Sequence, residues 1–233
     1  MALIVVTATR CSQADFSRDT LLGRSLPGVA QLTPLALRGF FENSRPLGAC
    51  YNEVIEQAAA DDTLVFVHDD VYLNDWMLGW RVQEALLHFD VVGVVGNRRR
   101  QPGQETWYMQ PSQIVDGVRS MTTFDSAYLS GVIAHGSPDS WQLSNYGPVP
   151  QPVKLIDGVF MAVKAGRLKK TGVRFDAGLG FHLYDLDFCR AVEQAGLKIG
   201  TWPIAMIHAS GGGSVQSAAW AASSAMYLAK WGG

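Results

Sequence analysis

The sequence predicts an α/β fold, with a mainly parallel sheet enclosed by helices as an α/β/α sandwich. Short runs at residues 3–6, 63–67 and 91–95 are apolar and rich in β-branched side chains, as expected for strands buried on both faces of a sheet. Segments of helical periodicity separate these runs, and alternating strands and helices are typical of α/β folds. With 233 residues, 48% of them apolar, the chain can bury one such core but is short for two. We therefore expect residues 1–233 to form a single domain.

In the first half of the chain, strands are expected where short apolar runs lead into polar loops, and helices where apolar side chains recur every three to four residues. The expected elements are strands at 3–6, 35–37, 63–67 and 91–95, a helix at 51–60, and a helix from about 76 to 89. Asp61-Asp62 ends the first of these helices, and Asn74 or Asp75 can cap the start of the second.

Residues 101–152 lose this periodicity and are rich in Gly, Pro, Ser, Trp and Tyr. A segment of this length is too long for a passive connection, so we expect an irregular, functional excursion over one face of the sheet. Regular elements then return: a strand at 153–163, a short basic helix, a helix at 184–195 ended by Gly196, a strand at 198–204, and a C-terminal helix at about 215–231.

Composition and charge exclude several classes of protein. The net charge of −2 and the apolar content argue against disorder and against nucleic acid as a partner. Cys11, Cys50 and Cys189 form no CxxC pair, so neither a zinc cluster nor a disulfide scaffold is expected, and a reducing cytoplasm fits best. The first residues are interpreted as a strand rather than a signal peptide, and no transmembrane segment is expected. Peripheral membrane contact through the C-terminal helix stays open.

The first candidate site is His68-Asp69-Asp70, directly after the strand at 63–67. Two adjacent carboxylates at a strand end repel each other, and a bound Mg²⁺ or Mn²⁺ would relieve that repulsion because hard cations prefer carboxylate oxygens. Ligands of open α/β sheets also gather at such strand ends. The alternative is that both aspartates end the strand and cap a turn, and the pair alone does not decide between the two.

Further candidates lie late in the chain. Asp185 is placed at a helix start, where the helix dipole favours a carboxylate, although a simple N-cap would look the same. Asp187 and Arg190 are spaced for an ion pair within that helix. His208, just past the last strand, is either a ligand or an ordinary loop residue. The run 211–214, Gly-Gly-Gly-Ser, either cradles a phosphate or acts as a hinge.

Four motifs occur in a fixed order along the chain. They are Ala49-Cys50-Tyr51-Asn52-Glu53, the run 63–71 containing Phe66-Val67-His68-Asp69-Asp70-Val71, Asp157-Gly158 with Phe160-Met161, and Tyr184-Asp185-Leu186-Asp187-Phe188-Cys189. Together they resemble family 2 glycosyltransferases of the GT-A type, in the branch that carries "YN" followed by "FvHDDV". The resemblance covers residues 1 to about 210 and leaves the 101–152 excursion and the tail without counterparts.

The resemblance implies a role for each matching residue. Asp70 would hold Mn²⁺ or Mg²⁺ against the donor diphosphate, and His208 would complete the metal shell. Asp185 would be the general base, supported by Asp187 from the following turn. His68 stands where most relatives carry the first aspartate of the motif. The residues implied in donor binding are Thr7, Asn43, Asn52, His68, Asp69 and Asp157.

The implied reaction is transfer of a sugar from a nucleoside diphosphate donor, UDP-linked, to a glycan, lipid-linked or protein acceptor. Inversion requires a base that removes the acceptor proton on one side of the anomeric carbon, and a cation that stabilises the departing diphosphate on the other. Asp185 fits the first role, and Asp70 with His208 fits the second.

For the acceptor, we expect contacts from Trp141, Tyr146 and His182, with Trp107 and Tyr108 as further aromatic candidates in the excursion at about 101–152. Aromatic faces suit the apolar faces of sugar rings, although aromatic side chains that only shield a site from water would look the same. Arg98-Arg99-Arg100 either reaches a phosphate or is a solvated basic loop.

Two alternative functions stay open. A sugar-1-phosphate nucleotidyltransferase would share the sheet and the metal aspartates, but its first strand should lead into a glycine-rich basic loop, and residues 7–12 contain no glycine. A non-catalytic protein that binds sugar nucleotides is the other alternative, and the presence of Asp70, Asp185 and His208 together argues against it.

Overall fold

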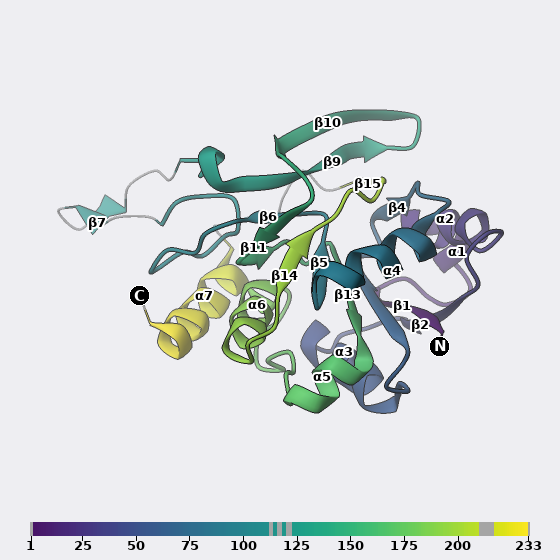
Figure 1. Ribbon diagram of the computed structural model, residues 1–233, viewed down its shortest axis with the longest axis horizontal. Coiled ribbons are helices and arrows are strands. Elements are labelled where there is room, and N and C mark those ends of the chain that lie inside the picture. The colour runs from purple at the N-terminus through teal and green to yellow at the C-terminus, as the bar shows by residue number, and fades with distance from the viewer. Residues whose placement is uncertain (1, 112–113, 116–117, 120–122, 210–216, 233) are drawn as a thin grey trace.

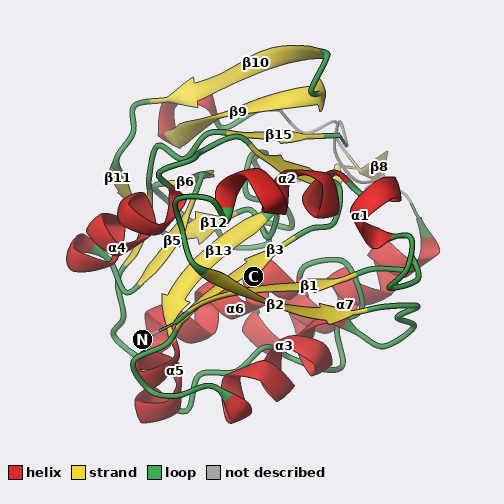
Figure 2. Ribbon diagram, turned by 90° about the vertical axis from the view of Figure 1, so that its right-hand side faces the viewer, coloured by secondary structure: helices red, strands yellow, loops and turns green. Residues whose placement is uncertain are grey.

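The computed structural model describes residues 2–111, 114–115, 118–119, 123–209 and 217–232. A larger, seven-stranded sheet has the order β11-β14-β5-β13-β3-β1-β2, and helices cover both of its faces (Figure 1 and Figure 2). Its strands are β1 (Leu3–Ala8), β2 (Leu35–Phe40), β3 (Thr63–Val67), β5 (Val91–Gly93), β11 (Gln151–Val153), β13 (Phe160–Lys164) and β14 (Ile199–Thr201).

A second sheet of six strands has the order β12-β6-β9-β15-β4, with β10 paired to β9. Its strands are β4 (Val71–Leu73), β6 (Val95–Asn97), β9 (Leu129–Ser137), β10 (Ser140–Gly147), β12 (Leu155–Ile156) and β15 (Met206–His208). A separate pair consists of β7 (Ile114–Val115) and β8 (Val118–Arg119). The helices are α1 (Phe16–Asp19), α2 (Leu21–Val29), α3 (Leu47–Gln57), α4 (Leu78–His88), α5 (Ala165–Thr171), α6 (Tyr184–Gln194) and α7 (Ala218–Trp231), with a 3-10 turn at Ser126–Tyr128.

The α/β fold class is confirmed, but the mainly parallel sheet is confirmed only in part. In the larger sheet, β1 pairs parallel with β2 and β3, and β5 pairs parallel with β14. β13 runs antiparallel to both β3 and β5, and β11 runs antiparallel to β14. The chain reaches β13 from the second sheet rather than through a crossover helix, so nothing requires β13 to run parallel to its neighbours.

The expected strand at 63–67 is β3, and each of its side chains is at most 1% exposed. Other boundaries differ from expectation. The apolar run at 91–95 is divided between two strands, β5 and β6, so the chain leaves one sheet for the other inside it. The helix expected at 51–60 already begins at Leu47. Asp75 precedes α4 rather than capping it, since the N-cap is Met77 and the Asp75 carboxylate accepts from the Met77 N–H at 3.0 Å.

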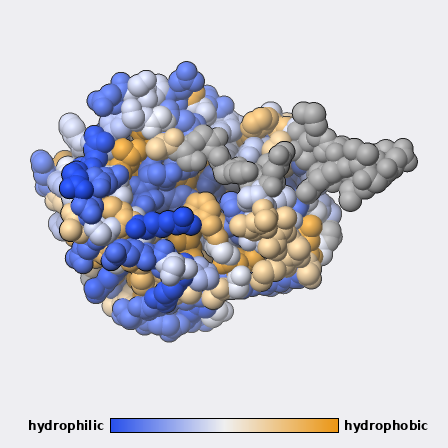
Figure 3. Space-filling model, turned by 180° about the vertical axis from the view of Figure 1, so that it is seen from behind, coloured by the Kyte–Doolittle hydropathy of each residue, from blue (hydrophilic) through white to orange (hydrophobic). Residues whose placement is uncertain are grey.

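The excursion at 101–152 is more regular than predicted, because β9 and β10 form an antiparallel hairpin within it. The residues of β9 and β10 do not alternate regularly between buried and exposed, so local periodicity does not indicate this hairpin. The C-terminal helix is present as α7. Its outward side carries alanines and Met226, and the view from behind shows apolar side chains gathered on the side where α7 lies (Figure 3).

A cluster of aromatic side chains supports the carboxyl end of β3. The Tyr51 ring packs on Phe66 with centroids 4.6 Å apart, and Phe175 stacks on Phe188 at 4.0 Å. Tyr184 lies at the edge of this cluster, 6.1 Å from the Tyr51 ring, and is 2% exposed. The buried cluster therefore holds the first turn of α6 against the strand end where His68 emerges.

Candidate metal and transfer site

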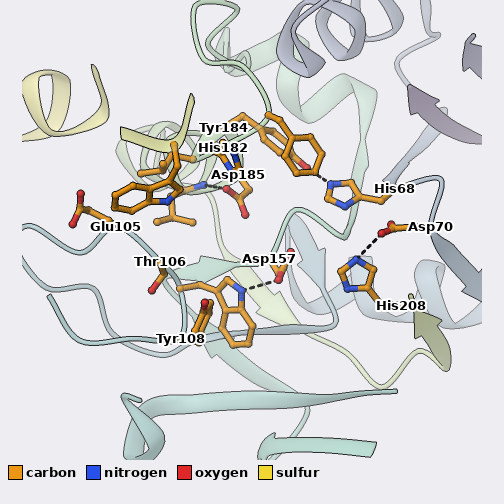
Figure 4. Close-up of a pocket in the computed structure, with 15 residues that line it drawn as sticks. His68, Asp70, Glu105, Thr106, Tyr108, Asp157, His182, Tyr184, Asp185 and His208 are labelled. Atoms are coloured by element: carbon orange, nitrogen blue, oxygen red, sulfur yellow. Dashed lines mark hydrogen bonds and ion pairs between the residues drawn. The ribbon is translucent and has the colours of Figure 1, made fainter. Parts of the chain in front are cut away.

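The ends of β3 and β15 bring together the three residues of a possible metal site. His68 follows the last residue of β3, and Asp70 immediately precedes β4. β4 pairs antiparallel with β15, which sets His208 opposite Val71. The His208 Nε2 atom lies 3.3 Å from the Asp70 Oδ2 atom (Figure 4). One ligand atom each from His68, Asp70 and His208 can be chosen so that all lie within 4.8 Å of one another.

The chemistry of this group fits a divalent cation. The Asp70 Oδ1 atom is buried and has no hydrogen-bond partner among the described residues, which leaves a carboxylate oxygen available to a cation. Burial acts to raise the pKa of Asp70, but the hydrogen bond and charge of His208 outweigh it and hold the pKa below its ordinary value. Burial lowers the pKa of His68. Asp70 is thus an anion and His68 a neutral imidazole at neutral pH, the forms in which both residues bind metals.

Asp185 lies across the same pocket, in the first turn of α6. Its Oδ2 atom accepts from the backbone N–H of Gly158 and its Oδ1 atom from that of Leu186, both at 2.9 Å. Burial, and then the nearby carboxylate of Asp157, raise the pKa of Asp185 to about 7, even though both backbone hydrogen bonds favour its ionised form. A carboxylate with a pKa near neutrality is suited to general-base catalysis.

Asp157 is fixed by two donors of its own. Its Oδ2 atom accepts from the Trp107 indole N–H at 2.7 Å, and its Oδ1 atom accepts from the Val159 backbone at 2.8 Å. Trp107 comes from the excursion, so this bond attaches the 101–110 segment to the rim of the pocket, where Figure 4 shows Thr106 and Tyr108 beside Asp157.

The pocket is lined from β3, β15, α6, α7 and the excursion. The lining residues are His68, Asp70, Glu105, Thr106, Trp107, Tyr108, Asp157, Phe181, His182, Leu183, Tyr184, Asp185, Leu186, His208 and Trp220. A second pocket shares Phe181 with the first. Its other lining residues include Thr9, Arg10, Asn43, Arg45 and Asp69. Thr9 donates to the Asp69 carboxylate at 2.5 Å. Of the predicted site residues, His68, Asp70, Asp157, His182, Asp185 and His208 therefore line one pocket, and Asn43 and Asp69 line its neighbour.

Two predicted donor contacts lie elsewhere. Thr7 is fully buried within β1, paired with Gly39 of β2, and lines neither pocket. β1 continues to Ala8, and the chain first reaches the second pocket at Ala8 and Thr9. The Asn52 side chain donates to the carbonyl of Phe175 at 2.8 Å and accepts from its N–H at 3.0 Å. Asn52 therefore links α3 to the segment before α6.

The predicted support of the base by Asp187 is wrong in geometry. The Asp187 side chain is 1% exposed, lies 2.8 Å from the Lys230 ammonium and accepts from the Trp231 indole N–H at 2.6 Å. Two residues along a helix correspond to a rotation of about 200°, so Asp187 faces α7 while Asp185 faces the pocket. Arg190 likewise contacts Trp231, with its guanidinium 4.8 Å from the ring centre, instead of pairing with Asp187.

The predicted acceptor residues are also divided. His182 lines the pocket, whereas Trp141 lies on β10, 53% exposed, and lines a different groove. Tyr146 packs behind Trp107 with ring centres 5.0 Å apart. Trp107 and Tyr108 do line the pocket. The basic loop at 98–100 is paired within the protein, Arg99 with Asp125 and Arg100 with Glu193, and the glycine run at 211–214 lies outside the described residues.

Sequence reasoning missed Glu105, Thr106, Tyr184 and Trp220. Tyr184 stands inside a quoted motif, and its place immediately before Asp185 was a usable signal. Glu105, Thr106 and Trp220 come from the excursion and from α7, which reach the pocket only through tertiary packing.

Comparison with known proteins decides the family. The profile of a family described as "Glycosyltransferase like family" matches residues 40–229. The chain belongs to this family. The match confirms the resemblance to glycosyltransferases and argues against a nucleotidyltransferase. No curated protein matches the sequence significantly.

Three solved glycosyltransferase structures are similar to this family member at low identity. The mannosyltransferase PcManGT from Pyrobaculum calidifontis, in complex with GDP-Man and Mn²⁺, is 13% identical with a TM-score of 0.48, over 97% of this chain and 61% of that one. GalNAc-T7 with UDP, GalNAc and Mn²⁺ is 11% identical, with a TM-score of 0.49, over 99% of this chain and 48% of that one. TarS from S. aureus is 14% identical, with a TM-score of 0.46, over 90% of this chain and 60% of that one. The chain thus spans 48% to 61% of the lengths of these structures. Among the described residues, no helix is long and apolar enough to cross a membrane.

Proposed function

We propose that this protein, acting as one catalytic domain, transfers a sugar from a nucleoside diphosphate donor, UDP-linked, to a hydroxyl group of a glycan, lipid-linked or protein acceptor, with inversion. The observation that carries the proposal is that one pocket holds both the group His68, Asp70 and His208 and the carboxylate of Asp185 with its raised pKa. The group of His68, Asp70 and His208 suits a cation that binds the donor diphosphate, and the Asp185 carboxylate suits proton removal from the acceptor hydroxyl.

Asp70 and His208 are assigned to hold the metal ion, Mn²⁺ or Mg²⁺. When bound there, such a cation supplies electrostatic stabilisation of the departing diphosphate. The neighbouring pocket, with Asn43, Asp69 and Arg45, is open beside the metal group and is assigned to the nucleoside end of the donor.

Asp185 is assigned as the base. In the proposed reaction, the acceptor oxygen bonds to the anomeric carbon, the bond from that carbon to the diphosphate oxygen breaks, and the acceptor proton passes to the Asp185 carboxylate. The N–H groups of Gly158 and Leu186 hold this carboxylate in one orientation, and each oxygen keeps a lone pair for the proton. His182, Trp107 and Tyr108, on the same pocket, are assigned to orient the acceptor.

The test is ligand-induced thermal stabilisation. A panel of nucleotide-sugars is measured with and without Mn²⁺, because a ligand that binds the native state raises its melting temperature by mass action. We expect one donor to stabilise the protein only when Mn²⁺ is present, and Asp70→Ala to abolish this effect. Glu84→Ala, an exposed carboxylate on α4, serves as the control and should behave as wild type. Equal stabilisation of Asp70→Ala and wild type would refute the assignment.

A further inference from the structure

The two ring nitrogens of His68 have different surroundings. Its Nε2 atom lies 2.8 Å from the hydroxyl oxygen of Tyr184, and that hydroxyl lies 3.0 Å from the carbonyl oxygen of Gly158. Figure 4 shows the imidazole with one edge towards Tyr184 and the other towards Asp70 and His208.

The single proton of the tyrosine hydroxyl decides the tautomer of His68. A carbonyl oxygen only accepts, and the buried carbonyl of Gly158 requires a donor, which the Tyr184 hydroxyl supplies. With its proton directed to the Gly158 carbonyl, the hydroxyl accepts from His68, which assigns the imidazole proton to Nε2. The Nδ1 atom is left with an unshared lone pair.

That lone pair is on the side of the possible metal site. His68 belongs to the group whose ligand atoms lie within 4.8 Å of one another. A metal-bound histidine commonly donates its other N–H to an oxygen, which fixes the tautomer and the ring orientation. The contact between the His68 Nε2 atom and the Tyr184 hydroxyl is an arrangement of this kind.

We propose that His68 is a third metal ligand, through Nδ1, that Tyr184 is its positioning residue, and that the resulting set of two imidazoles and one carboxylate selects a transition metal such as Mn²⁺ over Mg²⁺. This inference rests on the proposed function. Mg²⁺ takes oxygen ligands in strict octahedral geometry and loses water reluctantly. Imidazole nitrogens suit first-row transition metals, and Mn²⁺, which binds nitrogen most weakly of that series, still accepts them better than Mg²⁺ does. The histidine at the position of the usual aspartate thus offers a nitrogen atom, and not a carboxylate oxygen, to the metal group.

The experiment uses Mn²⁺ alone with the full chain, without nucleotide. Pulsed EPR of bound Mn²⁺ detects nitrogen ligands directly, and competition with Mg²⁺ measures selectivity. We expect couplings from two imidazole nitrogens in wild type and from one in His68→Asp. The same substitution should lower the ratio of Mn²⁺ to Mg²⁺ affinity by at least about tenfold, because it replaces a nitrogen ligand by an oxygen ligand.

Two further variants make the test specific. His135→Ala removes a different histidine, whose ring centre is 5.9 Å from that of His208, and both couplings should persist in it. Tyr184→Phe keeps the packed ring but removes the hydroxyl, and we expect Mn²⁺ to bind about 10-fold to 100-fold more weakly. If Tyr184 were only structural, its loss would lower the melting temperature and leave the Kd for Mn²⁺ unchanged.

Two nitrogen couplings in His68→Asp, or an unchanged ratio of Mn²⁺ to Mg²⁺ affinity, would overturn the proposal. A failure of the proposed function looks different. In that case wild type binds no metal, or it binds metal and neither binds nor consumes a nucleotide-sugar. Metal binding by wild type that is weakened in Asp70→Ala but unaffected in His68→Asp refutes only the role of His68.

Discussion

Only two positions separate Asp185 from Asp187, yet α6 turns their side chains to different surroundings. Asp185 lies at the pocket, where burial and the carboxylate of Asp157 raise its pKa to about 7. Asp187 lies beneath α7, where the Lys230 ammonium balances its charge and the Trp231 indole N–H donates a hydrogen bond to it. The environment therefore makes one carboxylate suited to accept a proton and the other suited to anchor a helix.

The raised pKa of Asp185 predicts the pH dependence of transfer. A base must be ionised to accept a proton, so kcat/KM should rise about tenfold per pH unit below about pH 7 and level off above it. Asp157→Asn removes the neighbouring negative charge and should move this limb to lower pH. Steady-state rates between about pH 5 and 9 measure both effects. In Asp185→Asn, which removes the base, kcat should fall by about 10²-fold to 10⁴-fold. A limb at the same pH in Asp157→Asn would contradict the assignment of Asp185.

At the scale of elements, α7 docks on the protein itself, a point that the sequence left open. Lys230 lies 2.8 Å from Asp187 on α6 and 2.7 Å from Asp176. Trp220 lines the transfer pocket, and the Ser224 hydroxyl bonds to the Glu105 carboxylate in the excursion. The helix thus connects the back of α6 to the loop that carries Trp107, so its docking contributes to the shape of the pocket.

Lys230→Met should destabilise the protein, because it leaves the buried Asp187 carboxylate without its cation. Breaking a fully buried pair costs about 3–5 kcal/mol. The Lys230 side chain is 41% exposed and the Trp231 N–H still donates to Asp187, so we expect about 2–3 kcal/mol of lost unfolding free energy. Urea denaturation measures this change. Lys170→Met, on the exposed side of α5, is the control and should stay within about 0.5 kcal/mol.

The double variant Asp187→Leu with Lys230→Met tests the cause. It removes both charges, so it should recover most of the stability lost in Lys230→Met. If the double variant is as unstable as Lys230→Met, the loss comes from packing of the lysine stem and not from the unpaired carboxylate.

At the scale of the whole molecule, the chain joins the two sheets by passing between them. Val94 separates β5 from β6, and its carbonyl faces Gly131 of β9 in the second sheet. Gly131 has φ of +105°, and a Cβ atom built there would lie 2.0 Å from the Val94 oxygen. A glycine is required here both by the backbone conformation and by the close approach of the two chain segments.

Gly131→Ala should therefore cost more than about 3 kcal/mol of unfolding free energy, as the sum of backbone strain and overpacking. Gly103→Ala is a matched control, because Gly103 also has positive φ, +69°, but nothing lies within 4 Å of its Cβ position. We expect the control to cost about 1 kcal/mol. Chemical denaturation of both variants measures the difference, and equal losses would show that the close approach of Gly131 to Val94 is not the cause.

Most of the strand ends that carry the site were predictable, because each is a local signal. The run at 63–67 reads as a strand from its β-branched residues, and the polar residues after it must then emerge at the sheet edge. The orientation of Asp187 away from Asp185 was also accessible, since helical rotation alone separates them. The antiparallel insertion of β13 was not, because pairing between distant strands leaves little trace in local periodicity. The hairpin of β9 and β10 pairs locally, but its residues do not alternate regularly between polar and apolar, so their pattern does not indicate strands.

The sequence by itself determined the kind of protein, through motifs whose residues keep their chemistry wherever the chain places them: a carboxylate with histidines for a metal, and a second carboxylate for a proton. Only the tertiary structure decided which of these residues meet. Tyr184 contacts His68 across 116 positions of sequence. The physical reason is that hydrogen-bond partners, burial and neighbouring charge depend on long-range packing, while the side-chain chemistry that they act on is local.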